Sequence, residues 1–262
     1  MYNVIGKSFE TEKEYFDFVV NNEKLIIDTK KSEMKMADGF GFSTTLLKKD
    51  FSSKEHNVNS DAKEILVKIA INSTNILDSH DDVHIPGLWD KSLKEKGGNM
   101  LHLQEHIRKF DHVISKGKDL NAYAETVSWK SLGFDMEGKT QILTFDSLVK
   151  ESQNEEMFNE YMKGNITEHS VGMQYVKLFV CINDDCYPEQ KENYDKYAPM
   201  VANREELERT KMFYAITEAK AIEGSAVLMG SNSFTPTISS TTKETVVEIK
   251  EEKSAIEKWL KS

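Results

Sequence analysis

Short apolar stretches with a two-residue period dominate the middle of the chain. Every second position from Ile65 to Ile71 is Ile or Val, which predicts a strand with at least one buried face. Comparable stretches predict further strands at residues 100–103, 122–129, 141–145, 170–180, 211–222 and 223–229. Many short strands without a regular strand–helix alternation indicate an α+β domain built on an antiparallel sheet or a small barrel.

Helical periodicity is confined to short segments. It predicts helices at residues 11–20 and 88–95. Ser152 and Glu155 have the spacing of a capping box, which predicts a helix that continues through Met162 and stops at Gly164. A charged insertion at residues 183–208 contains one more expected helix, from Asn203 onward.

The two ends of the chain differ from its middle. Residues 1–60 are interpreted as a partly loose N-terminal appendage, with a short strand at 24–28 and a polar loop from residue 30 onward. The core is expected at residues 61–232. Residues 233–262 are interpreted as a Ser/Thr-rich linker followed by an amphipathic tail helix.

Composition excludes several classes of partner. The chain has 262 residues, 39% of them hydrophobic, and a net charge of −10. This acidity argues against sequence-independent binding of nucleic acid and against docking on an anionic membrane, because both need clustered Lys and Arg. The sequence has no apolar run of about 18 residues and no secretory signature in its first ten residues, so a cytoplasmic setting is expected.

The two cysteines do not by themselves indicate a site. Cys181 and Cys186 enclose four residues, and no second Cys/His pair lies at a spacing suited to zinc. They are interpreted as a small disulfide or as two free thiols of a reducing compartment. Neither has a histidine next to it in sequence, so nothing supports a cysteine nucleophile.

Ser170 follows a helix stop and opens a strand, and it would be a nucleophile only if a histidine served as its base. The chain has seven histidines. His56 falls in the loose N-terminal segment. His169 is adjacent to Ser170 on a strand and therefore points to the opposite face. His80 and His84 flank two aspartates in what is expected to be a solvated loop.

Three histidines remain, namely His102, His106 and His112. His106 comes just after a strand, where sites are often built, but spacing alone favours it only slightly. All three could equally be ordinary surface or half-buried histidines. A metal-dependent hydrolase is a further reading, and it would use four side chains: His80, Asp81, Asp82 and His84.

Four segments in a fixed order carry a resemblance to a known family. They are residues 81–89 (DDVHIPGLW), 101–106 (LHLQEH) with 113–116 (VISK), 164–173 (GNITEHSVGM) and 216–227 (ITEAKAIEGSAV). Together they resemble the prohead (capsid maturation) proteases of tailed bacteriophages, relatives in fold of the herpesvirus assemblin proteases. The resemblance covers residues 65–232. The insertion within 181–208 and the pair Leu88-Trp89 depart from the family pattern.

The resemblance implies an assemblin-like fold, with an antiparallel β-barrel-like core flanked by short helices. It implies a serine endopeptidase with Ser170 as nucleophile, His106 as general base and Glu223 as the acidic third member, and with no cofactor or metal. Its substrates would be scaffolding protein, major capsid protein and the chain itself, inside the immature capsid in the host cytoplasm. Self-association is left open. The alternative is a catalytically inactive assembly or scaffolding protein that keeps the fold.

Overall fold

The computed structural model describes residues 2–4, 6–35 and 56–242. The expected tail helix lies outside the described residues, as does most of the polar loop that precedes residue 56. Within the described residues six α-helices are present. They are α1 (Glu12–Asn21), α2 (Glu23–Ser32), α3 (Asp90–Lys96), α4 (Glu155–Met162), α5 (Pro188–Tyr197) and α6 (Arg204–Thr210).

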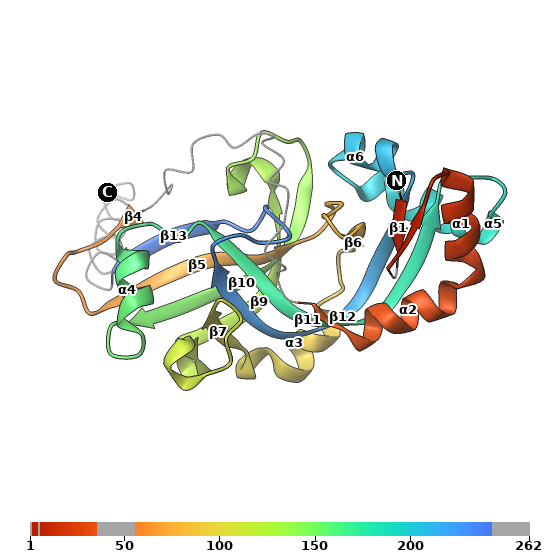
Figure 1. The fold of residues 1–262 in the computed structure, drawn as a ribbon. Coiled ribbons are helices and arrows are strands. Elements are labelled where there is room, and N and C mark those ends of the chain that lie inside the picture. Colours follow the sequence, from red (N-terminus) through yellow and green to blue (C-terminus); the bar gives the residue numbers. More distant parts are fainter. Residues whose placement is uncertain (1, 5, 36–55, 243–262) are drawn as a thin grey trace.

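Two mixed sheets form the framework (Figure 1). The five-stranded sheet has the order β4 (His56–Asn57), β13 (Thr237–Thr242), β5 (Glu64–Ser73), β10 (Lys139–Lys150) and β9 (Leu120–Ser128). The second sheet has the order β3 (Met34–Lys35), β11 (Glu168–Ile182), β12 (Met212–Val227), β7 (Leu101–Gln104) and β8 (Val113–Lys116), and β6 (Asp82–His84) also pairs with β12. A small hairpin, β1 (Tyr2–Val4) and β2 (Lys7–Phe9), precedes α1.

The expected α+β class is confirmed, but the strands are not purely antiparallel. β13 runs parallel to β4, and β12 runs parallel to both β6 and β7. The described strands do not close into a barrel.

The long antiparallel pair β11–β12 connects the two ends of the molecule (Figure 1). At 15 and 16 residues these strands are much longer than an ordinary strand of about six. One end belongs to the main core beside the five-stranded sheet. At the other end, α1 and α2 pack into the same main core, whereas α5 and α6 build a second apolar cluster with the strands, which includes Phe213, Tyr194 and Leu207.

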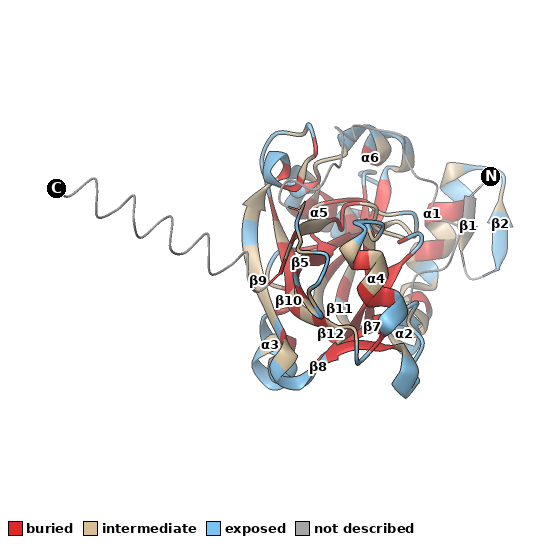
Figure 2. Ribbon diagram, turned by 90° about the vertical axis from the view of Figure 1, so that its left-hand side faces the viewer, coloured by how far each residue is buried: buried red, intermediate tan, exposed pale blue. Residues whose placement is uncertain are grey.

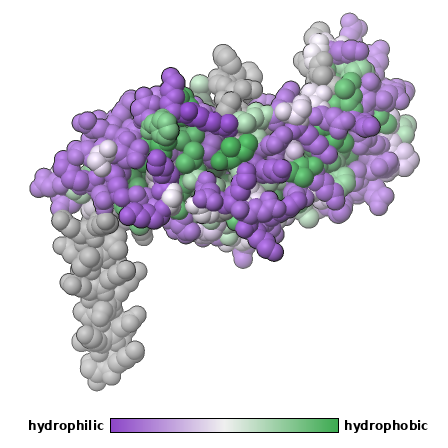
Figure 3. Space-filling model, turned by 90° about the horizontal axis from the view of Figure 1, so that it is seen from below, coloured by the Kyte–Doolittle hydropathy of each residue, from purple (hydrophilic) through white to green (hydrophobic). Residues whose placement is uncertain are grey.

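The N-terminal helices are part of the main core. Phe16 and Val19 of α1 and Ile26 of α2 are buried in the same cluster as the strands of both sheets (Figure 2). Burying each of these side chains contributes about 1.5–3 kcal/mol. The face seen from below is mostly hydrophilic, with smaller groups of apolar side chains among the polar ones (Figure 3). None of the helices in the described ranges is long and apolar enough to span a membrane.

Several local expectations are wrong. Residues 24–28, expected as a strand, lie in helix α2. The N-cap of α4 is Asn154 rather than Ser152, and its side chain accepts a hydrogen bond from Met157 N. Residues 237–242, expected in a linker, form strand β13 in the middle of a sheet. The expected break near residue 222 is a bulge within the single strand β12.

Candidate active site

The candidate site is built on one face of the β11–β12 pair. Ser170 lies directly opposite Ser225, and Gly172 directly opposite Glu223. Opposed residues of an antiparallel pair point to the same side of the sheet, so these four positions share a face. A Cβ added to Gly172 would lie 1.9 Å from Glu223 Oε1. The Glu223 carboxylate therefore covers the backbone of Gly172 and leaves no room for a side chain there.

His106 enters this face from a strained turn after β7. Glu105 and His106 have φ angles of 50° and 57°, and Ile107 N donates to Gln104 O over 2.9 Å. Positive φ at both central residues is the pattern of a type I′ turn, which usually carries Asn and Gly. Each non-glycine residue in this region costs about 1–2 kcal/mol. Such strain persists only where surrounding contacts hold it.

Contacts with β12 hold the turn. Glu105 N donates to Ala226 O over 3.0 Å, and Glu105 Oε1 accepts from Leu228 N over 2.9 Å. His106 N donates to Ser225 Oγ over 3.1 Å. The turn is thus tied to the end of the same strand that carries Glu223.

His106, Glu223 and Ser225 form a closed hydrogen-bonded ring. His106 Nδ1 is 2.6 Å from Glu223 Oε1, and Ser225 Oγ donates to Glu223 Oε2 over 2.7 Å. The backbone bond from His106 N to Ser225 Oγ completes it. The side chains of His106 and Glu223 are only 7% and 1% exposed. Two residues that are 117 positions apart are therefore brought into contact, out of water.

Ser170 lies next to this ring across the strand pair. Directly opposed residues of an antiparallel pair have Cβ atoms about 4.5–5.5 Å apart, and Ser170 and Ser225 are such a pair. Ser170 is 7% exposed. It also lines a cavity of about 20 Å³ together with His80, His84 and Asn72. The structure thus brings His106 and Glu223 into contact and places Ser170 beside their partner Ser225.

The neighbouring His169 is committed to the other side of β11, as strand alternation predicts. Its Nδ1 donates to the carbonyl of Thr235 over 3.0 Å, so its Nε2 accepts from the Tyr161 hydroxyl at 3.0 Å. Tyr161 in turn lies 3.2 Å from Nε2 of His102, whose Nδ1 is 2.8 Å from Ser147 Oγ. Burial lowers the pKa of His169 to about 4 and the pKa of His102 well below its usual value.

His112, the last open candidate, pairs at the surface with Asp111 over 2.8 Å. Among His102, His106 and His112, His106 is the one that contacts a buried carboxylate, that of Glu223.

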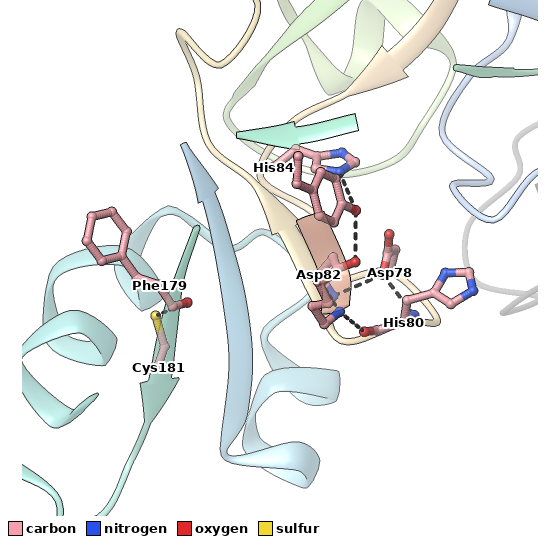
Figure 4. Close-up of polar contacts among 8 residues, drawn as sticks. Asp78, His80, Asp82, His84, Phe179 and Cys181 are labelled. Atoms are coloured by element: carbon pink, nitrogen blue, oxygen red, sulfur yellow. Dashed lines mark hydrogen bonds and ion pairs between the residues drawn. The ribbon is translucent and has the colours of Figure 1, made fainter. Parts of the chain in front are cut away.

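The segment with His80 and His84 is not a solvated loop throughout. Asp82 and His84 are buried in β6, and Asp82 binds Lys30 Nζ at 2.6 Å and the Tyr175 hydroxyl at 2.8 Å (Figure 4). Burial lowers the pKa of His84 to about 4. Burial and the charge of Asp82 raise the pKa of Asp78 to about 7. In the described part of the chain, no three His, Cys, Asp or Glu side chains are grouped so that they could hold a metal ion.

The cysteines are free thiols, which is one of the two interpretations that their spacing left open. Cys181 is buried, and its thiol lies 3.8 Å from the carbonyl oxygen of Phe179 (Figure 4). Burial raises the pKa of the Cys181 thiol, which disfavours the nucleophilic thiolate. Cys186 is exposed, and its hydrogen bond to Asp184 raises its pKa.

Sequence reasoning assigned no role to Ser225. The signal that could have revealed one is its position two residues after Glu223 on a strand, which puts both side chains on one face.

Comparisons with protein-family models, with curated proteins and with solved structures found no match.

Proposed function

We propose that the protein is a serine endopeptidase in which Ser170 is the nucleophile, His106 the general base and Glu223 the carboxylate that orients the base. The observation that carries this proposal is the buried 2.6 Å contact between His106 Nδ1 and Glu223 Oε1. A carboxylate on Nδ1 directs the basic lone pair of the imidazole to Nε2, which is the arrangement of a serine-hydrolase triad. Ser170 lies on the same sheet face, opposite Ser225.

The reaction would proceed in two halves. Ser170 Oγ attacks a peptide carbonyl carbon while its proton passes to His106 Nε2, and Glu223 stabilises the resulting imidazolium. His106 then gives this proton to the leaving amine, which leaves an acyl group on Ser170. Water, deprotonated by His106, attacks the ester and releases the acid.

The biological setting belongs to the same proposal and rests on the order of the four segments that resemble prohead proteases. In that setting the enzyme cleaves scaffolding protein, major capsid protein and itself inside an immature capsid in the host cytoplasm. An assemblin-like core is part of this proposal. Its support is the placement of the resembling segments on β6, β7, β11 and β12, which form one continuous sheet.

The test is covalent labelling of the full chain with a fluorophosphonate, which reacts with activated serines. We expect an adduct on Ser170 in the unsubstituted chain and in Ser60→Ala, a control at an exposed turn. Ser170→Ala and His106→Ala should lose labelling, whereas His112→Ala should keep it. Mass spectrometry of the same chains, incubated alone and with scaffolding protein, reports cleavage.

Loss of either member of the Ser/His pair should lower the cleavage rate by several orders of magnitude. If the unsubstituted chain neither labels nor cleaves more than Ser170→Ala, the protease proposal is refuted. A non-catalytic assembly protein would then be the better reading.

A further inference from the structure

We propose that Ser225 is a positioning residue that sets both the imidazole tautomer and the backbone conformation of His106. This inference rests on the proposed function, because it assigns Ser225 a role toward the base of that reaction. Its basis is the closed ring of three hydrogen bonds that joins Ser225 Oγ to His106 N and to Glu223 Oε2, and Glu223 Oε1 to His106 Nδ1.

The direction of each bond in the ring follows from one fixed donor. The backbone N–H of His106 can only donate, so Ser225 Oγ accepts it. The single hydroxyl proton of Ser225 is then available for Glu223 Oε2, at 2.7 Å. Glu223 accepts there as a carboxylate, and its other oxygen receives the Nδ1–H of His106. The ring thus favours the imidazole tautomer whose basic nitrogen is Nε2.

Ser225 also restrains the strained turn. The φ of 57° at His106 is unfavourable for a residue with a side chain, and the bond from His106 N to Ser225 Oγ is one of the contacts that offset this cost. Removing the hydroxyl would leave this N–H and one carboxylate oxygen of Glu223 without their partner. Both changes act on His106, one through its backbone and one through its ring.

Ser225 is itself unsuited to be the nucleophile. It is fully buried, with 0% exposure, and its hydroxyl proton is engaged by Glu223. Ser170 lies directly opposite, on the neighbouring strand. The two serines therefore have different roles: Ser225 orients the base, and Ser170 is the nucleophile.

The experiment compares Ser225→Thr with Ser225→Val in the full chain. Thr and Val have nearly the same shape, so both add the same crowding at this buried position, but only Thr keeps the hydroxyl. Urea unfolding of both variants controls for folding. The first two readouts are the rate of Ser170-dependent cleavage and its pH profile. The third is hydrogen exchange of the His106 amide, and this one alone is measured in a Ser170→Ala background to prevent self-cleavage.

We expect Ser225→Val to cleave about 10- to 100-fold more slowly than Ser225→Thr, the rate equivalent of one hydrogen bond to a charged group. The acidic limb of its pH profile should move to higher pH, because a carboxylate with one donor fewer stabilises the imidazolium more strongly. The His106 amide should exchange faster in Ser225→Val alone.

Equal rates, equal pH profiles and equal amide exchange in the two variants would overturn the role of Ser225 and leave the protease proposal intact. Absence of cleavage by the unsubstituted chain would instead overturn the proposed function, and the role of Ser225 with it.

Discussion

Replacing Gly172 with alanine should disconnect the base from its carboxylate without touching either residue. The new Cβ would lie 1.9 Å from Glu223 Oε1, 2.8 Å from its Cδ and 3.2 Å from its Cγ. Ordinary contact begins at about 3.4 Å, so Oε1 must move by about 1.5 Å. The end of a glutamate is normally flexible, but this one is buried and bonded at both oxygens.

The cost follows from what the displacement breaks. A shift of that size would lengthen or misalign the bonds of 2.6 Å from Oε1 to His106 and of 2.7 Å from Oε2 to Ser225. A hydrogen bond to a charged group contributes about 1.5–3 kcal/mol, and the displacement disrupts two such bonds to the carboxylate, so the unfolding free energy of Gly172→Ala should fall by about 3–6 kcal/mol. Cleavage should slow by about 10²- to 10⁴-fold, the range expected when a triad histidine loses its orienting carboxylate.

Urea unfolding and cleavage rates check this, with Gly224→Ala as the matched control. A Cβ on Gly224 would meet Phe145 and Ile71 at 2.6–2.8 Å on the opposite face of the sheet. Gly224→Ala should therefore be destabilised by core overpacking, by about 1–3 kcal/mol, and its folded fraction should keep most of its activity.

The decisive measurement is a double-mutant cycle with Glu223→Ala. Removing the carboxylate removes the clash, so Gly172→Ala should cost much less stability in the Glu223→Ala background than in the unsubstituted chain. The reasoning fails if the two costs are equal within about 0.5 kcal/mol, because the alanine would then act on the backbone and not on Glu223.

Other buried polar groups give three further predictions. Tyr161→Phe leaves two histidines without their shared hydroxyl, so its unfolding free energy in urea should fall by about 2–4 kcal/mol. Lys30→Met removes the 2.6 Å ion pair with the buried Asp82, which keeps its hydrogen bond from Tyr175, and should cost about 3–5 kcal/mol, with partial recovery in Lys30→Met/Asp82→Asn. The third concerns acid. Burial lowers the pKa of His169 to about 4, so between that value and about 6.5 the unfolded chain binds a proton that the folded chain does not. The unfolding free energy should therefore fall as pH decreases through this window. The slope should be steeper in the unsubstituted chain than in His169→Gln, by at most about 1.4 kcal/mol per pH unit.

Strand periodicity predicted much of the framework because side-chain alternation is a local property. The alternation from Ile65 to Ile71 falls within β5, and the segment at residues 170–180 falls within β11. Residues 237–242 look like a linker because Ser and Thr dominate them, yet their backbone pairs with β5. Asp82 looks like a loop residue because its partner Lys30 lies 52 positions away in the sequence. In both cases, contacts with residues that are distant in the sequence determine the structure.

The candidate site also combines features that follow from local alternation with features that depend on distant residues. The opposite faces of His169 and Ser170 followed from strand alternation alone, and the bonds of His169 confirm it. The contact between His106 and Glu223 could not be predicted from spacing, because 117 residues separate them. Only the resemblance in the order of four segments had pointed to this pair. The left-handed turn at Glu105 and His106 carries no glycine or asparagine that would have revealed it.

Two glycines explain how one strand pair can carry both a site and a core. Val171 pairs with Gly224, and the next rung pairs Gly172 with Glu223. At Gly224 the missing side chain lets Phe145 and Ile71 of the five-stranded sheet approach the backbone. One rung away and on the opposite face, the missing side chain of Gly172 makes room for the Glu223 carboxylate. The strand pair therefore lacks a side chain on each of its two faces, at two neighbouring positions. The Glu223 carboxylate can lie flat on the sheet and meet His106, while the core closes tightly directly behind it.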